Sequence, residues 1–233
     1  MNKEVELENY LCITPNKFAI YLFDKKNLKN SYKEELSIEE NFDFKNLNTL
    51  KKFLDQNIYK IEKLSGKFVE NISIVLENEQ ILDLYMGIKK KNYNNFVTQD
   101  NLINSLQEAK DLFKENYQNE KIIHMLVNKY FINKKKYNSF ENNLNSDHLG
   151  LEIQFKFISN FIINDLNSML ETYQIKVSKY IDASYLKTLF ENNLEVSEMA
   201  HKIVHGYNEN EVSLIQKNQK KPGFFEKFFQ LFS

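Results

Sequence analysis

Two hydrophobic periods alternate along this chain, and their mixture restricts the fold classes open to it. From Leu149 to Ser159, apolar and polar residues alternate, which is typical of a half-buried β-strand. From Leu47 to Leu64, leucines and isoleucines recur at helical spacing, and Gly66 follows as a stop signal. Because segments of both kinds recur along the chain, the sequence predicts a mixed α/β or α+β fold.

Other segments predict individual hairpins, helices and strands. Tyr10 to Phe23 is interpreted as a hairpin with its turn at Thr14-Pro15-Asn16. Asn71 to Leu76 and Ile81 to Ile88, with a polar turn between them, are interpreted as a second hairpin. Thr98 is a candidate N-cap for a helix that contains Leu102 to Phe113. Further strands are expected over 122–132 and 174–181, and further helices over 161–173 and from 183 to 190.

Composition argues against several functions. The 31 basic and 32 acidic residues give a net charge of -1, so no overall field attracts nucleic acid, and we expect no nucleic-acid partner. A single cysteine, Cys12, excludes an internal disulfide and suits a reducing compartment. The sequence shows neither a spanning apolar run nor a signal-peptide pattern. We therefore expect a cytoplasmic protein that neither crosses a membrane nor is exported.

Signals for catalysis, cofactors and metals are weak. Only five glycines are present, and Ser65-Gly66-Lys67 lacks the upstream glycine of a phosphate loop. Arrangements of Ser/His/Asp or Cys/His residues lack local support, so we expect no enzyme, no catalytic residue and no cofactor. His201 and His205 share a helix face, which is the geometry of a two-ligand metal site, but the sequence shows no evident third ligand. We therefore predict no metal site.

The final residues carry the main functional signal. Residues 206–222 are polar and predict a flexible linker. Residues 223–233 predict an amphipathic membrane-binding helix, whose apolar side consists of Phe224, Phe225, Phe228, Phe229, Leu231 and Phe232. The basic residues that would lie beside anionic lipids are Lys220, Lys221 and Lys227. Two alternatives are a helix that docks in a groove of a partner protein and a last helix packed on the core.

The order of these elements resembles a known family. The first hairpin, the helix that ends at Gly66, the strand Asn71 to Leu76, the helix start Thr98-Gln99-Asp100 and the phenylalanine-rich end are together similar to bacterial cell-division protein FtsA. FtsA is an actin-like protein that tethers FtsZ filaments to the cytoplasmic membrane. The resemblance implies that residues 1–46 and 159–205 form a partial actin-like subdomain. It also implies that residues 47–158 form an inserted strand-helix-strand (SHS2-like) interaction subdomain.

The resemblance implies a scaffold that is peripheral on the inner face of the cell membrane. It would recruit or link division proteins, with FtsZ and further copies of the chain as candidate partners. The family's aspartate-x-glycine phosphate loop aligns here with Cys12 and Thr14, followed by Pro15. Neither residue suits a metal-bound nucleotide, and the second actin-like half has no counterpart in this sequence. We therefore expect no nucleotide hydrolysis. The alternatives are a soluble adaptor whose last helix docks in a partner and a degenerate actin-like ATPase.

Overall fold

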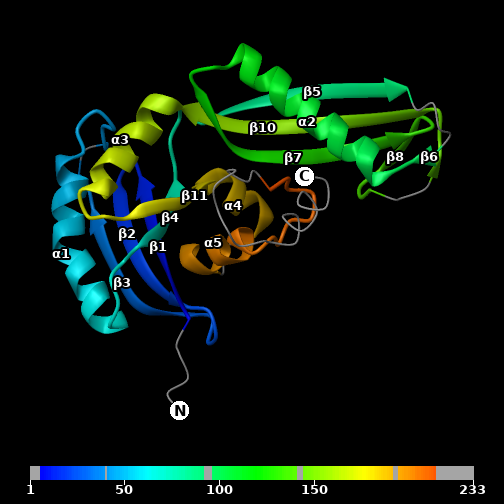
Figure 1. The fold of residues 1–233 in the computed structure, drawn as a ribbon. Coiled ribbons are helices and arrows are strands. Elements are labelled where there is room, and N and C mark those ends of the chain that lie inside the picture. Colours follow the sequence, from blue (N-terminus) through cyan, green and yellow to red (C-terminus); the bar gives the residue numbers. More distant parts are fainter. Residues whose placement is uncertain (1–5, 40, 92–95, 141–143, 191–193, 214–233) are drawn as a thin grey trace. The chain divides into compact units, whose positions relative to one another are not determined.

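The computed structural model describes residues 6–39, 41–91, 96–140, 144–190 and 194–213 (Figure 1). The chain forms two compact units. Unit 1 contains residues 1–83, 116–123 and 156–208, and unit 2 contains residues 84–115, 124–155 and 209–233. Helices and strands occur in both, which confirms the predicted mixed α/β class.

Unit 1 is built on a five-stranded sheet in the order β11-β4-β1-β2-β3. The strands are β1 (Leu7–Thr14), β2 (Lys17–Asp24), β3 (Lys29–Ser37), β4 (Asn71–Leu76) and β11 (Lys176–Asp182). The first three strands form an antiparallel meander, while β4 runs parallel to both β1 and β11. The hairpin predicted around Thr14-Pro15-Asn16 is therefore confirmed, since β1 pairs with β2 across that turn.

Helices pack on both faces of this sheet. On one face, α1 (Asn48–Ser65) and α3 (Asn160–Glu171) bury their apolar sides against alternate residues of β1, β2 and β4 (Figure 1). Gly66 ends α1 in the left-handed conformation, with φ of 70°, as the stop signal predicted. Two shorter helices, α4 (Ala183–Leu189) and α5 (Val196–Val204), follow β11. The α5 helix packs on β1 and β2 through the face that carries Phe23, whose ring lies 5.0 Å from that of His201.

Unit 2 contains a four-stranded sheet in the order β5-β10-β7-β8 and one long helix, α2 (Gln99–Asn116). The strands are β5 (Leu82–Lys91), β7 (Glu120–Ile132), β8 (Lys135–Tyr137) and β10 (His148–Ser159), with a small pair β6 (Phe96–Val97) and β9 (Leu144–Asn145). Thr98 and Asn101 exchange hydrogen bonds at the start of α2, which confirms the predicted cap. The rings of Phe113 and Phe155 stack 5.0 Å apart between the helix and the sheet.

The predicted inserted subdomain begins at residue 47, whereas unit 2 begins at residue 84. Residues 47–83 belong to unit 1, because α1 covers its sheet and β4 pairs with both β1 and β11. The hairpin predicted between 71–76 and 81–88 was wrong for the same reason, since β4 and β5 lie in different sheets. A polar turn between two apolar runs indicates a change of direction, but it does not identify the strand with which each run pairs.

The predicted linker over residues 206–222 also begins too early. Its first part pairs with the edge of β7, where the Val127 amide donates to Asn210 O at 2.9 Å and the Val212 amide donates to Met125 O at 2.8 Å. The carboxylate of Glu211 also lies 2.9 Å from the ring of buried His124. A polar segment can pair in this way because the backbone supplies the hydrogen bonds.

Candidate functional site

The parallel strands of unit 1 direct polar residues to one edge of the sheet. Strand β1 ends at Thr14, strand β11 ends at Asp182, and Glu77 directly follows β4. In open α/β sheets, ligands usually bind outside the carboxyl ends of the parallel strands. This edge is therefore the first candidate for a binding site, and its side chains decide what it can bind.

Asp182 is the most buried charge at this edge, and a lysine neutralises it. Its side chain is 3% exposed, and Lys156 Nζ lies 2.9 Å from Asp182 Oδ2 and 3.0 Å from Asp83 Oδ1. The Ser184 amide donates to Asp182 Oδ1 at 2.9 Å, so Asp182 also caps α4. Burial raises the pKa of Asp182, but hydrogen bonds from Ser184 and Lys156 outweigh it and hold that pKa below its ordinary value.

A second lysine pairs with the carboxylate that follows β4. Lys187 Nζ lies 2.9 Å from Glu77 Oε2, and both side chains are largely exposed. Such a surface pair contributes about 0–1 kcal/mol to stability, far less than a buried one. A lysine ammonium group therefore pairs both with Asp182, at the end of β11, and with Glu77, directly after β4.

The turn between β1 and β2 closes on itself. Thr14 Oγ1 donates to Lys17 O at 2.9 Å, and Pro15 and Asn16 form the turn. Cys12 lies inside β1, between partners Ala19 and Val75, and its side chain is buried. Burial raises the pKa of the Cys12 thiol to about 12, so the thiol stays protonated near neutral pH. The residues aligned with a phosphate loop thus serve as a core side chain and a turn.

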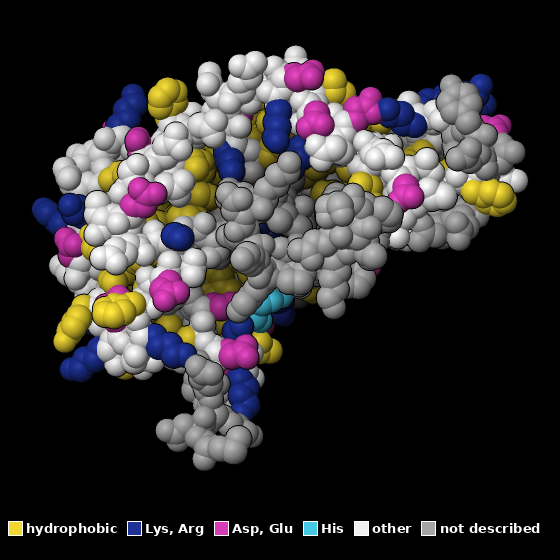
Figure 2. Space-filling view, in the orientation of Figure 1, with side chains coloured by type: hydrophobic (Ala, Val, Ile, Leu, Met, Phe, Trp, Pro, Cys, Tyr) yellow, Lys and Arg dark blue, Asp and Glu magenta, His cyan; other side chains and the backbone are white. Residues whose placement is uncertain are grey.

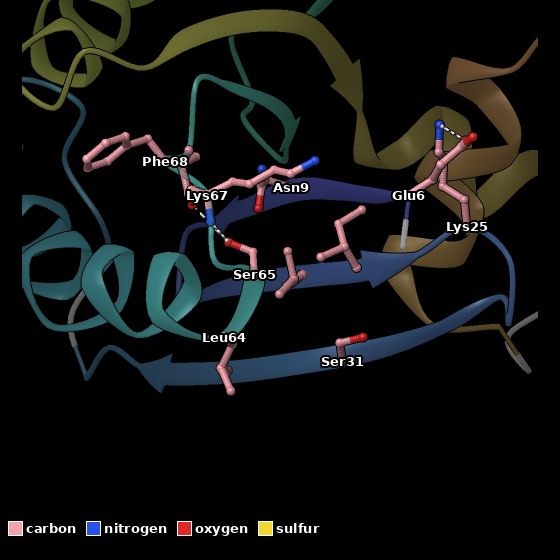
Figure 3. A pocket seen from close by; sticks show the side chains of 11 residues that line it. Glu6, Asn9, Lys25, Ser31, Leu64, Ser65, Lys67 and Phe68 are labelled. Atoms are coloured by element: carbon pink, nitrogen blue, oxygen red, sulfur yellow. Dashed lines mark hydrogen bonds and ion pairs between the residues drawn. The ribbon is translucent and has the colours of Figure 1, made fainter. Parts of the chain in front are cut away.

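A pocket of about 590 Å³ lies at the opposite end of β1, next to the loop that follows α1 (Figure 3). It is lined by Glu6, Leu7, Asn9, Leu22, Lys25, Ser31, Leu64, Ser65, Lys67, Phe68 and Val69. Lys25 pairs with Glu6 at 2.9 Å, and the Lys67 amide donates to Ser65 Oγ at 3.3 Å. Asn9 Nδ2 donates to Asn71 O at 3.2 Å, outside the lining. The side chains that line the pocket show no catalytic arrangement.

Glu8, near the start of β1, contacts both His201 and His205, the histidines that share a helix face. Glu8 Oε2 lies 2.9 Å from His201 Nδ1, and Glu8 Oε1 lies 2.8 Å from His205 Nε2. The sequence analysis found no third ligand beside this pair, because Glu8 is 193 residues away from His201. A lone glutamate in an acidic N-terminal segment carries no local signal of such a contact.

The predicted membrane-binding residues Phe224, Phe225, Phe228, Phe229, Leu231, Phe232, Lys220, Lys221 and Lys227 lie outside the described residues. Their role therefore stays a prediction. Within the described ranges, no helix is both long enough and apolar enough to cross a bilayer.

No protein-family model matches the sequence, and no curated protein matches it. Among solved structures, the chain is similar to the cytoplasmic domain of EpsL, an inner-membrane component of the type II secretion system of Vibrio cholerae. The TM-score is 0.36 at 5% identity, over 76% of this chain and 57% of that one.

The chain is also similar to a PilM-PilN type IV pilus biogenesis complex, with a TM-score of 0.47 at 7% identity, over 79% of this chain and 49% of that one. A third structure is a Bacteroides thetaiotaomicron protein with an actin-like ATPase fold, with a TM-score of 0.31 at 13% identity, over 78% of this chain and 54% of that one. The chain thus spans 49–57% of the length of these three structures. At such scores we draw no functional conclusion from them.

Proposed function

We propose that this protein is a membrane-attached, non-catalytic scaffold of the actin-like class. In this proposal unit 1 is a partial actin-like subdomain, unit 2 provides contacts with other proteins, and residues 223–233 bind the membrane surface. The early antiparallel hairpin and the parallel strands of unit 1 agree with the actin-type start that the FtsA resemblance implies.

The observation that supports a scaffold without nucleotide hydrolysis is the pairing of Lys156 with Asp182 and Asp83. A magnesium-bound nucleotide at this edge would need carboxylates that face the metal or its waters. Here the most buried carboxylate is already neutralised by an ammonium group. Breaking a buried ion pair by removing one of its partners costs about 3–5 kcal/mol. The edge is therefore better suited to hold the fold together than to bind a metal and a nucleotide.

Attachment to the membrane rests on the sequence of the tail. Partial burial of each phenylalanine ring at the headgroup boundary contributes on the order of 1 kcal/mol, and nearby lysines add about 1 kcal/mol each beside anionic lipids. Ordering a short helix offsets part of this gain, so one copy binds reversibly. Several copies held together bind more firmly, because each later contact is effectively intramolecular.

Within this class we propose that the protein acts in cell division and binds division proteins, with FtsZ among the candidates. We also propose that it self-associates, which would bring several membrane-binding helices together. This finer assignment rests on the FtsA resemblance of the sequence. A soluble adaptor is the second candidate, and in that case the last helix would dock in a protein groove instead of a bilayer.

Liposome co-sedimentation of the full chain tests the anchor. We expect binding to vesicles that contain anionic lipid, and loss of binding in a Phe225→Glu, Phe228→Glu double variant, because two charges would enter the apolar side of the helix. A matched Phe68→Glu variant changes an exposed phenylalanine of unit 1 and should bind as the wild type does. Equal sedimentation of all three proteins, or of none, would contradict the anchor. Thermal stabilisation by Mg²⁺ and ATP would instead favour the ATPase alternative.

A further inference from the structure

We propose that Glu8, His201 and His205 form a binding site for a transition-metal cation of the Zn²⁺ class. Each residue offers one donor atom, and no two of the three donors lie more than 4.8 Å apart. This site is separate from the sheet edge that carries Asp182, and it does not depend on the proposed scaffold function.

The fold brings together three residues that lie near the beginning and near the end of the unit 1 sequence. His201 lies in the last turn of α5, and His205 is the residue that caps its C-terminus. A separation of four residues places the two rings on one side of the helix, with their centroids 4.4 Å apart. Glu8 is the second residue of β1 and pairs with Phe23 of β2, and α5 packs on this part of the sheet.

The distances suit a small cation after a modest adjustment. Zn²⁺ binds imidazole nitrogen and carboxylate oxygen at about 2.0–2.2 Å, so two donors of one tetrahedral ion lie roughly 3.3–3.5 Å apart. The Glu8 oxygens lie 2.9 Å from His201 Nδ1 and 2.8 Å from His205 Nε2. The two contacts would therefore have to lengthen by roughly 0.5 Å for the Glu8 carboxylate and both ring nitrogens to bind one ion.

The donor set identifies the class of cation. Mg²⁺ and Ca²⁺ prefer oxygen ligands, whereas two imidazoles and one carboxylate suit Zn²⁺ and related transition metals. Each ring presents a single nitrogen toward Glu8, and a bound cation would displace the proton that otherwise bridges the ring and the carboxylate. The same three side chains can therefore form a hydrogen-bonded cluster in the metal-free state and bind a metal ion when one is present.

The surroundings support the carboxylate and leave access from solvent. Tyr10 Oη donates to Glu8 Oε2 at 2.5 Å, which is the kind of outer contact that orients a metal ligand. Lys25 Nζ lies 3.7 Å from Glu8 Oε1, but its closer partner is Glu6, at 2.9 Å, so the local positive charge is compensated.

The His205 side chain is 47% exposed, which gives an ion a path from solvent and room for water as a fourth ligand. Figure 2 shows histidine side chains at the molecular surface, near acidic and basic ones. A bound ion would tie the last helix of unit 1 to its first strand. Its expected effect is therefore to stabilise unit 1.

The test is a Zn²⁺ titration of the metal-stripped full chain by calorimetry, with Co²⁺ as a second probe whose visible absorption reports tetrahedral coordination. We expect one ion per chain, and a Tm that rises by roughly 5–10 °C when free Zn²⁺ is 100-fold above Kd. His205→Ala and Glu8→Gln should each weaken binding at least about 100-fold, because each removes a ligand. His148→Ala changes an exposed histidine on β10 and should bind as the wild type does.

Two results would overturn the proposal. One is a wild-type chain that shows no saturable binding of either ion, which would leave a hydrogen-bonded cluster only. The other is unchanged affinity in His205→Ala and Glu8→Gln, or an equal loss in His148→Ala, since either would place the ion elsewhere. Circular dichroism of each variant in the metal-free state establishes that a loss of affinity is not a loss of fold.

Discussion

Unit 1 has one carboxylate cluster near each end of its parallel strands, and the two clusters differ in their cationic partners. Asp182, at the end of β11, pairs with the ammonium group of Lys156. Glu8, near the start of β1, contacts the imidazoles of His201 and His205. A protonated lysine neutralises a carboxylate but cannot bind a metal, whereas a neutral imidazole can.

The chemical nature of its partner thus determines what each carboxylate can bind. Burial makes the Asp182–Lys156 pair a structural element, because separating two buried charges is costly. The Glu8 cluster is more exposed, and its partners can exchange a proton for an ion. Substitutions at Lys156, Asp182 and Lys187 test the role of the lysine pairs, and the Zn²⁺ titration tests that of the histidines.

The largest effect is expected from Lys156→Met, which keeps most of the side-chain volume but removes the charge. Asp182 would then lose the ammonium group that lies 2.9 Å from its Oδ2 atom, so we expect unfolding in urea to show a loss of about 3–5 kcal/mol. A loss below about 1 kcal/mol would mean that Asp182 is stabilised by its other hydrogen bonds alone.

A smaller, pH-dependent effect is expected from Asp182→Asn. The folded-state pKa of Asp182 is lowered, so its contribution to stability is present above the unfolded pKa of about 3.9 and is lost as the pH falls through the folded pKa. Near neutral pH we expect the variant to be about 1–3 kcal/mol less stable, since asparagine still accepts hydrogen bonds. Urea unfolding between pH 7 and pH 3 should show the difference shrinking at low pH. A difference independent of pH would contradict the charged state assigned to Asp182.

The smallest effect is expected from Lys187→Ala, which breaks the exposed pair with Glu77. Solvent screens this pair, so the loss should be about 0–1 kcal/mol and should fall further at high salt. The measurement is urea unfolding at low and high ionic strength. A loss as large as that of Lys156→Met would remove the distinction between buried and exposed pairs at this edge.

Much of the local structure could be predicted from the sequence. The helix over 47–64, its stop at Gly66, the cap at Thr98 and the hairpin around Thr14-Pro15-Asn16 all follow from spacing and turn residues, and the structure contains each of them. The β3 strand was not predicted. It is an edge strand with a mostly exposed, polar sequence, so neither alternation nor a hydrophobic run indicates it.

The candidate sites could be predicted only in part. The helical spacing of His201 and His205 was visible, but Glu8 as their neighbour was not. Lys156 lies at a polar position of the alternating segment 149–159, and in the structure it pairs with Asp182. An ion pair between residues that are distant in the sequence cannot be predicted from local patterns. A lysine on a strand has the same neighbours in the sequence whether its ammonium group contacts water or a buried carboxylate.

Elements whose hydrogen bonds and apolar periods are local could be predicted from residue patterns alone. These are the helices, the first hairpin and the alternating strand at 149–159. Tertiary structure decided the pairing of β4 with β1 and β11, the docking of residues 210–212 on β7, and the contacts that hold Glu8 and Asp182. A helix forms its backbone hydrogen bonds within one segment, so its pattern is visible locally. A strand needs hydrogen-bond partners on another strand, and a buried charge needs a partner that can be distant in the sequence, so neither partner can be identified from the local pattern.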